Sequence, residues 1–440
     1  MSLPRYPEYR DSGAAWIGSL PVHWQARQAR RLFEQRRDSA CPDDEQLSAT
    51  QKYGVIPQRL FMEQEDQKLV LALSGLDNFK HVEPNDFVIS LRSFQGGIER
   101  SLNAGCVSPA YTVLRPSSGL AARYWEYLLK CAPYIAALQT TTDGIREGKN
   151  ISYSQFGALV LPLAPATEQV AIAAFLDRET AKIDALIAEQ EKLIALLAEK
   201  RQATISHAVT RGLNPDAPMK DSGVAWLGEV PAHWGMRRLK SVSDFTTSGP
   251  RGWSDRIAED GSLFVQSGDL NESLGVDFAA AKRVKVEDGA EAARTLLSDG
   301  DIVVCITGAK TGNVAVCSSV PEPAYVNQHL CLVRPNPEVV PLFLGVALKS
   351  SVGETQFELS QYGLKQGLSL ENVRETLIPL PSLSEQALIV AFLETETAKV
   401  DALRLEAERA IVLLTERRSA LIAAAVTGQI DVRGALPQSA

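Results

Sequence analysis

Two segments of the chain have the apolar periodicity of very long helices. Neither glycine nor proline occurs from Ala166 to Arg211 or from Ser382 to Thr427. Apolar residues recur there at steps of three, four and seven, the heptad spacing of helices that pair along a narrow seam. The predicted seam consists of Ile183, Leu186, Leu193, Leu197, Val400, Leu403, Ala410 and Leu414, interrupted by Gln190 and Ala407. We expect these helices to pack against each other in antiparallel orientation; two ordinary core helices in separate domains are the alternative.

The rest of the chain alternates short apolar runs with turns. Phe87–Leu91 and Tyr111–Leu114 have the length and the β-branched or aromatic content of strands. Ala121–Leu138 has helical spacing, and Pro133 should break that helix near Ala132. Residues 235–380 contain equivalents of several of these runs, with loops of different length and sequence. The predicted fold class is therefore α+β.

The sequence is an internal repeat. Residues 11–24, DSGAAWIGSLPVHW, recur as residues 221–234, DSGVAWLGEVPAHW, and residues 168–210 recur as residues 385–427. The order of motif, variable stretch and helix thus occurs twice, which indicates a duplicated half-molecule with pseudo-twofold symmetry. The motif is predicted to be an irregular cap that buries its tryptophans. Its histidines, His23 and His233, have no metal-ligating or catalytic partner at motif spacing and are predicted to be hydrogen-bonded structural residues.

Five ranges follow from these patterns. They are a first globular domain at 1–165, a first long helix at 166–212, a second globular domain at 213–382, a second long helix at 383–430, and a tail at 431–440.

Composition narrows the classes of function. The net charge of −8 argues against a simple basic nucleic-acid binder, although the first variable stretch is mildly basic. Six cysteines include no C-x-x-C pair, so neither a zinc ribbon nor a redox motif is indicated. No apolar run is long enough to span a membrane and no signal-peptide core is present, which predicts a cytoplasmic protein.

Motifs for catalysis are missing. No G-x-G-x-x-G precedes a helix, and Thr307–Gly312 lacks the spacing of a phosphate-binding loop. Ser108-Pro-Ala-Tyr111 differs from the D/N/S-P-P-Y/F/W tetrapeptide of amino-methyltransferases at its third residue. This segment and its counterpart, Pro323-Ala-Tyr325, are predicted to be turns that lead into strands. The chain is predicted to be non-catalytic and to hold no metal or cofactor of its own.

Loops of the variable stretches carry residue types that bind nucleic acid. Arginine and lysine reach phosphates or guanine edges, and asparagine or glutamine can pair with adenine. For each residue alone, a solvated surface charge is sufficient explanation, but as a set in the variable part of each repeat they favour recognition. The candidate DNA-binding residues are Lys52, Tyr53, Arg59, Arg92, Gln95, Arg100, Arg146, Lys149, Arg251, Trp253, Lys310, Asn313, Lys365 and Gln366.

Together these segments resemble the specificity (S) subunit of type I restriction-modification systems. The resemblance rests on the duplicated W-x-G-x-x-P-x-H-W motif, on KYGVIP at 52–57, on DFVIS at 86–90, on SPAY, and on the Glu-Gln that enters a TAK[IV]DAL helix. It implies two DNA target-recognition domains joined by an antiparallel coiled coil. It further implies a bipartite, asymmetric DNA target whose half-sites lie about one helical turn apart, roughly 34–36 Å.

The same resemblance implies partners in a host-defence complex. Two methyltransferase (modification) subunits and the restriction motor-nuclease subunits would dock on the chain, without a membrane, and would carry S-adenosylmethionine, ATP and Mg²⁺. A recognition subunit for another methyltransferase or defence effector is the nearest alternative. A stand-alone DNA methyltransferase or nuclease is disfavoured by the missing motifs, and a purely structural coiled-coil protein would not explain two large globular domains.

Overall fold

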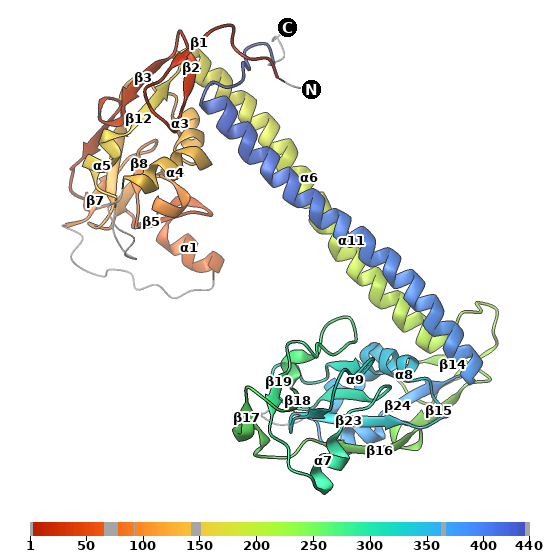
Figure 1. Ribbon diagram of the computed structural model, residues 1–440. Helices are drawn as coiled ribbons and strands as arrows, with labels where there is room; N and C mark the ends of the chain where they lie inside the picture. Colours follow the sequence, from red (N-terminus) through yellow and green to blue (C-terminus); the bar gives the residue numbers. More distant parts are fainter. Residues whose placement is uncertain (1–2, 66–77, 92, 142–150, 362–366, 436–440) are drawn as a thin grey trace. The chain divides into compact units, whose positions relative to one another are not determined.

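The computed structural model describes residues 3–65, 78–91, 93–141, 151–361 and 367–435 (Figure 1). The chain forms two compact units, the first made of Met1–Glu191 and Glu408–Ala440 and the second of Lys192–Ala407. The boundary between the units crosses both long helices. Each unit therefore combines one globular domain with half of each helix, whereas the predicted ranges separate the helices from the domains. In the part of the chain that is described, no helix is both long and apolar enough to cross a membrane.

The first globular domain is built on a four-stranded antiparallel sheet in the order β4-β11-β8-β9. Its strands are β4 (Phe33–Arg36), β8 (Phe87–Ile89), β9 (Glu99–Arg100) and β11 (Thr112–Pro116). Two-stranded pairs are β1 (Tyr9–Asp11) with β2 (Ser19–Pro21), β3 (Gln25–Gln28) with β12 (Val160–Leu163), β5 (Leu47–Thr50) with β6 (Gly54–Pro57), and β7 (Lys80–Val82) with β10 (Gly105–Val107). The helices are α1 (Gln58–Glu65), α2 (Ser93–Gly96), α3 (Ala122–Leu128), α4 (Ala132–Thr140) and α5 (Tyr153–Ala158).

Aromatic side chains join this sheet to its helices. Phe33 of β4 meets Phe87 of β8, Trp125 of α3 and Phe156 of α5 in edge-on contacts, with ring centroids 5.6, 5.2 and 5.7 Å away. All four side chains are fully buried. Edge-on aromatic pairs add to the large apolar area that such rings bury, so Phe33 is a central contact of the first core.

The second globular domain repeats this framework and adds to it. Its sheet β16-β23-β20-β21 corresponds to β4-β11-β8-β9, and the pair of β15 (Gly235–Arg238) with β24 (Leu377–Leu380) corresponds to β3 with β12. A further four-stranded sheet, β17-β19-β18-β22, has no equivalent among the described residues of the first domain. The shared strands are β16 (Ser243–Ser248), β20 (Ile302–Cys305), β21 (Val314–Val316) and β23 (Leu330–Pro335); the added ones are β17 (Ile257–Ala258), β18 (Ser262–Val265), β19 (Lys282–Val284) and β22 (Ala324–Val326). The pair β13 (Met219–Asp221) with β14 (Glu229–Pro231) and the helices α7 (Ala290–Thr295), α8 (Pro341–Lys349), α9 (Ser351–Ser360) and α10 (Leu370–Glu375) complete the domain.

A buried acid–base pair recurs at the same place in both frameworks. Asp86 precedes β8 and lies 2.7 Å from Nε of Arg36, and Asp301 precedes β20 and lies 2.7 Å from Nη2 of Arg334. The arginine comes from β4 in the first domain and from β23 in the second. The duplicated sequence therefore preserves the buried carboxylate, while the strand that supplies its cation has changed.

The two long helices pair in antiparallel orientation within each unit (Figure 1). They are α6 (Ala166–Arg211) and α11 (Leu383–Val426). In the first unit, Arg418 Nε lies 2.8 Å from Asp184 Oδ1; in the second, Arg201 Nε lies 3.2 Å from Asp401 Oδ1. The two arginines are equivalent in the repeat, and so are the two aspartates. One ion pair made twice is the signature of antiparallel helices with pseudo-twofold symmetry, and it confirms the predicted fold class.

The seam between these helices differs in phase from the prediction. Ile183, Leu197 and Val400 are buried as expected, and Ala407, predicted to interrupt the seam, is only 3% exposed. Three predicted seam residues instead face solvent: Leu186 is 45% exposed, Leu193 41% and Leu403 50%. Half-buried side chains are found at Ile187, Gln190, Ile194, Ala410 and Leu414. From the shared position at Ile183 the α6 seam therefore continues by four residues and then three, not by three and then four.

Of three shorter elements, two have their predicted form and one does not. The helical segment 121–138 is broken near Ala132, as predicted, into α3 and α4; Pro133 lies in the first turn of α4, where its missing N–H costs nothing. Pro109–Tyr111 is a turn before β11, as predicted. Its counterpart is not a turn, because Ala324 and Tyr325 lie in β22 and pair in parallel with β18 of the added sheet.

Candidate nucleic-acid interface

The repeated motif holds each globular domain on the start of a long helix. In the first unit, Glu168 in the first turn of α6 accepts hydrogen bonds from Trp24 Nε1 at 2.9 Å and from the Tyr6 hydroxyl at 3.0 Å. The ring nitrogen Nε2 of His23 lies 2.7 Å from the other carboxylate oxygen. Trp24 and Tyr6 are buried and Glu168 is 8% exposed. The prediction that His23 is a hydrogen-bonded structural residue is confirmed.

The glutamine that follows each glutamate also binds the globular domain to the long helix. Gln169 accepts from the backbone N–H of Ala121 at 3.0 Å and from Trp125 Nε1 at 3.2 Å. Gln386 likewise accepts from the backbone N–H of Val340 at 2.7 Å. Both amides are buried. Sequence reasoning missed these roles; the available signal was the duplicated Glu-Gln pair in the first turn of each helix.

We call these contacts between the repeated motif and the start of a long helix the anchor of each unit. The second anchor has fewer hydrogen bonds than the first. His233 Nε2 lies 3.0 Å from Glu385, but the histidine side chain is 56% exposed. The indole nitrogen of Trp234 is buried and has no hydrogen-bond partner among the described residues. An unpaired buried donor costs free energy, so the second anchor should contribute less stability than the first.

The residues after α11 also belong to the first anchor. Gly428 has a left-handed φ of 72°, and its carbonyl accepts from the Tyr9 hydroxyl at 3.1 Å. The backbone N–H of Asp431 donates to Pro4 O at 2.8 Å, and Val432 is fully buried. Up to residue 435, the range predicted as a separate tail is therefore packed against the N-terminal segment.

In the first unit the structure brings several predicted DNA-binding residues together. Lys52 Nζ lies 4.7 Å from the centroid of the Tyr53 ring, a cation–π contact. Their loop lies against α2, since a Cβ built at Gly96 would be 2.5 Å from the Gln51 side chain. Gln95 is exposed on α2. Arg59 of the neighbouring helix α1 has a side chain 76% exposed, with Nη2 3.8 Å from Glu45.

Arg100 is more constrained than the other candidates. Its Nε donates to Asn85 Oδ1 at 3.0 Å and its Nη1 to Glu126 at 3.0 Å, and its side chain is 17% exposed. A guanidinium held by two partners of its own chain has fewer donors for a ligand. In the structure, Arg100 therefore links residues of its own domain, and its contact with DNA stays a prediction.

Glu99 lies buried next to these loops. Its carboxylate is 2.8 Å from Lys130 Nζ, which also donates to the carbonyl oxygen of Gln51 at 3.4 Å. Burial raises the pKa of Glu99 to about 7, and the attraction of Lys130 offsets only part of that shift. The second carboxylate oxygen is buried and has no hydrogen-bond partner in the described structure, which also disfavours the ionised form.

Glu99→Gln should therefore change how the stability of the first unit depends on pH. Between the ordinary pKa of 4.5 and about 7, the folded form binds more protons at Glu99 than the unfolded form does. The contribution of Glu99 to stability accordingly falls as pH rises through that window. The variant should lose this decline and gain stability relative to wild type at pH 8. Hydrogen exchange at pH 5 and pH 8 tests this, with Glu34→Gln, an exposed glutamate of β4, as control; an unchanged pH dependence in Glu99→Gln would contradict it.

In the second unit, one predicted contact residue belongs to the core. Trp253 is 3% exposed, and its ring meets those of Tyr325 and Phe264 at centroid distances of 5.6 and 6.3 Å. A ring buried in this way presents little surface to a ligand, and the predicted contact of Trp253 with DNA stays a prediction. Arg251, two residues earlier, is exposed.

Lys310 and Asn313 lie in the loop between β20 and β21 and line a pocket of about 840 Å³. Lys310 Nζ donates to Gly268 O at 3.3 Å, and Lys349 Nζ donates to Asn313 Oδ1 at 3.3 Å. Arg201 of α6 lines the same pocket, and burial lowers the pKa of Lys349. These two candidates are thus placed where the second globular domain meets its part of the long helices.

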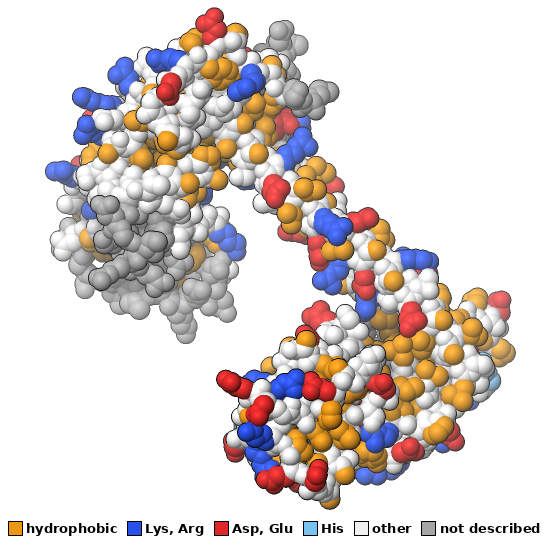
Figure 2. Space-filling view, viewed as in Figure 1, with side chains coloured by type: hydrophobic (Ala, Val, Ile, Leu, Met, Phe, Trp, Pro, Cys, Tyr) orange, Lys and Arg blue, Asp and Glu red, His pale blue; other side chains and the backbone are white. Residues whose placement is uncertain are grey.

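The remaining predicted DNA-binding residues lie outside the described residues: Arg92, Arg146, Lys149, Lys365 and Gln366. On the face drawn in Figure 2, acidic side chains are more frequent on the second globular domain than on the first. This distribution agrees with the mildly basic character of the first variable stretch. Long-range electrostatic attraction of DNA should accordingly favour the first domain.

Comparison with known sequences gives a coherent result. A family model described as the type I restriction modification DNA specificity domain matches residues 231–409. The specificity subunit of the type I restriction enzyme EcoBI from Escherichia coli is 27% identical over 313 residues, which make up 68% of this chain. The chain covers 64% of the length of that relative.

Two solved structures share the fold. The HsdS subunit from Thermoanaerobacter tengcongensis aligns with a TM-score of 0.57 at 17% identity, covering 93% of this chain and 98% of that one. A chain from a structure concerned with complex assembly and conformational transition of the type I R-M system aligns with a TM-score of 0.64 at 18% identity, covering 95% and 99%. At these identities the likeness concerns the fold.

Proposed function

This chain belongs to the specificity-subunit family of type I restriction-modification systems, and we propose that it is the DNA-recognition subunit of such a system. The observation that carries the proposal is the duplicated framework. Both globular domains share the four-stranded sheet and the anchor on a long helix, whereas the loops differ and the second domain has an added sheet. Two different readers on one chain suit a bipartite, asymmetric DNA target.

The proposed role is recognition and assembly without catalysis by this chain. Base contacts would come from the variable loops, and phosphate contacts from their lysines and arginines. Adenine methylation would be carried out by modification subunits that bind S-adenosylmethionine. Restriction subunits of the same complex would use ATP and Mg²⁺ for translocation and cleavage.

Exposed leucines on the long helices support the docking of two modification subunits. Leu186 and Leu403, equivalent in the repeat, are 45% and 50% exposed, and the equivalent pair Leu196 and Leu413 is 51% and 63% exposed. Large apolar side chains on the outside of a helix pair favour a protein contact surface. Each unit presents one member of each pair, so two copies of one partner can bind equivalent surfaces.

Exchange of the variable stretches tests the proposal. Residues 25–160 are replaced by the same region of a relative with a different target, and the variant is expressed with its methyltransferase. We expect one half of the methylated motif to change while the other half and the spacer persist. The matched control exchanges residues 235–380 and should change only the other half. A change in both halves, or in neither, from a single exchange would contradict the assignment.

A further inference from the structure

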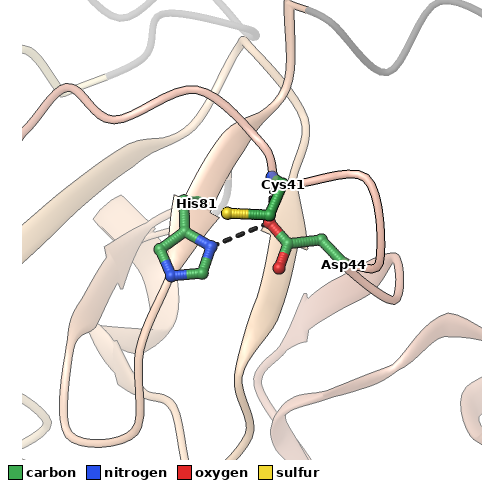
Figure 3. Close-up of side chains that lie close together, drawn as sticks. All are labelled: Cys41, Asp44 and His81. Carbon is green, nitrogen blue, oxygen red and sulfur yellow. Dashed lines mark hydrogen bonds and ion pairs between the residues drawn. The ribbon is translucent and has the colours of Figure 1, made fainter.

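A cysteine, an aspartate and a histidine meet at one edge of the first globular domain (Figure 3). Cys41 and Asp44 belong to the turn ahead of β5, and His81 lies on β7. One potential ligand atom from each residue, a thiol sulfur, a carboxylate oxygen and a ring nitrogen, lies within 4.8 Å of the other two. The cluster could not be predicted from local sequence, because His81 is far from Cys41 and Asp44 along the chain.

The geometry is close to that of a metal centre. Zinc bonds of about 2.3 Å to sulfur and about 2.0–2.2 Å to nitrogen or oxygen place tetrahedral ligand atoms roughly 3.3–3.6 Å apart. The present separations are at most 4.8 Å, so each would have to change by no more than about 1.5 Å to reach that range. His81 Nδ1 and Asp44 Oδ2, now 2.8 Å apart, would have to separate slightly, while exposed Cys41 can turn inward.

Neighbouring contacts hold the ligand atoms in place. The second ring nitrogen of His81, Nε2, lies 3.0 Å from Glu83 Oε1. A carboxylate on the far nitrogen is the arrangement that fixes the orientation and tautomer of metal-bound histidines. The same Asp44 oxygen accepts from the backbone N–H of Cys41 at 2.8 Å, which keeps the turn closed. His81 and Asp44 side chains are 13% and 9% exposed, so water competes weakly for them.

We propose that Cys41, Asp44 and His81 form a binding site for a divalent transition-metal ion of the zinc type. A ligand set of sulfur, nitrogen and oxygen suits Zn²⁺ or Co²⁺, whereas Mg²⁺ and Ca²⁺ prefer oxygen ligands alone. Water would occupy the fourth position. The ion replaces protons on the Cys41 thiol and on His81, and it links the turn of residues 41–44 to strand β7. Among described residues the second globular domain has no equivalent cluster, so the site belongs to the first target-recognition domain alone.

Without a metal, the contacts of His81 have a simpler explanation. Hydrogen bonds that His81 donates to Asp44 and Glu83 raise its pKa, and a charged imidazolium between two carboxylates would also hold the turn to the strand. That explanation gives the Cys41 thiol no part. A test of the proposal must therefore detect whether the Cys41 sulfur binds the metal ion.

Cobalt titration of the full-length chain reports on it directly. After treatment with a chelator, Co²⁺ should produce a thiolate-to-cobalt charge-transfer band that saturates at one ion per chain and disappears when Zn²⁺ is added. Cys41→Ser should abolish the band, and Asp44→Asn or His81→Ala should weaken Co²⁺ binding at least about tenfold. Glu83→Gln should weaken it by about 10–100-fold through its effect on His81.

Two control variants separate this site from nonspecific binding. Asp43→Asn alters an exposed carboxylate beside the cluster, and Cys106→Ala removes a buried thiol whose sulfur lies 4.0 Å from Asp44 O. Both should keep the band. A wild-type chain without a thiolate band, or a band that survives Cys41→Ser, would overturn the proposal. A test without any substitution is to alkylate the wild-type chain with and without Zn²⁺. Bound Zn²⁺ should protect the Cys41 thiol, and the absence of protection would overturn the proposal.

Discussion

Glu168→Gln is expected to weaken the first anchor strongly, and the equivalent Glu385→Gln to weaken the second only slightly. The amide keeps the size of the side chain, and its oxygen can take the place of Oε2, which accepts from both Tyr6 and Trp24. The negative charge is lost, however, and an amide N–H then faces the ring nitrogen of His23. Because hydrogen bonds to a charged acceptor contribute about 1.5–3 kcal/mol and neutral ones about 0.5–1.5 kcal/mol, the weakening of the two bonds to Oε2 should cost about 2 kcal/mol.

The second anchor supplies the matched control. Glu385 is contacted by His233, whose side chain is 56% exposed, while the indole nitrogen of Trp234 has no partner there that could be lost. An exposed ion pair contributes about 0–1 kcal/mol.

Hydrogen exchange followed by mass spectrometry reads the two units separately. Glu168→Gln should accelerate exchange of residues 5–24 by about thirtyfold or more, since every 1.4 kcal/mol is a factor of ten. Glu385→Gln should accelerate residues 219–234 by less than about fivefold. Equal acceleration in the two variants would contradict the unequal anchors.

The long helices, the duplication and the structural role of His23 could be predicted because each depends on neighbouring residues or on a direct comparison of two segments. Runs of more than forty residues without glycine or proline leave few alternatives to a helix, and α6 and α11 begin at Ala166 and Leu383, the first residues of the predicted ranges. The repeat required the two halves to share one framework. Both conclusions depend on neighbouring residues or on direct comparison of segments.

Features that depend on distant residues could not be predicted. Trp253 was a candidate for DNA contact because it follows arginine and glycine in a variable loop, but Phe264 and Tyr325 from two strands of the added sheet bury it. Arg100 was a candidate because arginine side chains reach phosphates and guanine edges, but Asn85 and Glu126 accept hydrogen bonds from its guanidinium. Local sequence does not state which strands will come together, so it does not state which loop residues remain available to a ligand.

The phase of the helix seam is an intermediate case. Leu186 and Ile187 are both apolar, and so are Leu193 and Ile194. A heptad that passes through Ile183, Gln190 and Leu197 can therefore continue through the leucines or through the isoleucines. Packing against the partner helix selects one of the two. In the structure the isoleucines Ile187 and Ile194 are half-buried, and the leucines Leu186 and Leu193 are exposed. Excess apolar residues at both phases are what a helix needs to pair on one face and bind a further protein on another.

Leu197→Glu should consequently destabilise the chain, whereas Leu193→Glu should have little effect on its stability. Leu197 is 6% exposed on the seam, so the substitution removes apolar contacts and places an unpaired carboxylate between the helices. Large-to-small changes at buried leucines alone cost about 2–5 kcal/mol, and the buried charge adds to this. Leu193 is 41% exposed on the same helix, and Leu193→Glu should change stability by no more than about 0.5 kcal/mol.

Thermal unfolding followed by circular dichroism measures the first effect, and binding of the purified modification subunit measures the second. Leu197→Glu should lower the unfolding temperature clearly. Leu193→Glu should leave it nearly unchanged. It should reduce affinity for the modification subunit, because Leu193 lies three residues before Leu196 on the same side of α6, where that subunit is proposed to dock. Glu199→Lys, which reverses the charge of an exposed residue of α6, controls for nonspecific electrostatic effects. If Leu193→Glu destabilised the chain as much as Leu197→Glu, the seam would follow the leucines and the docking surface would have to be placed elsewhere on the helices.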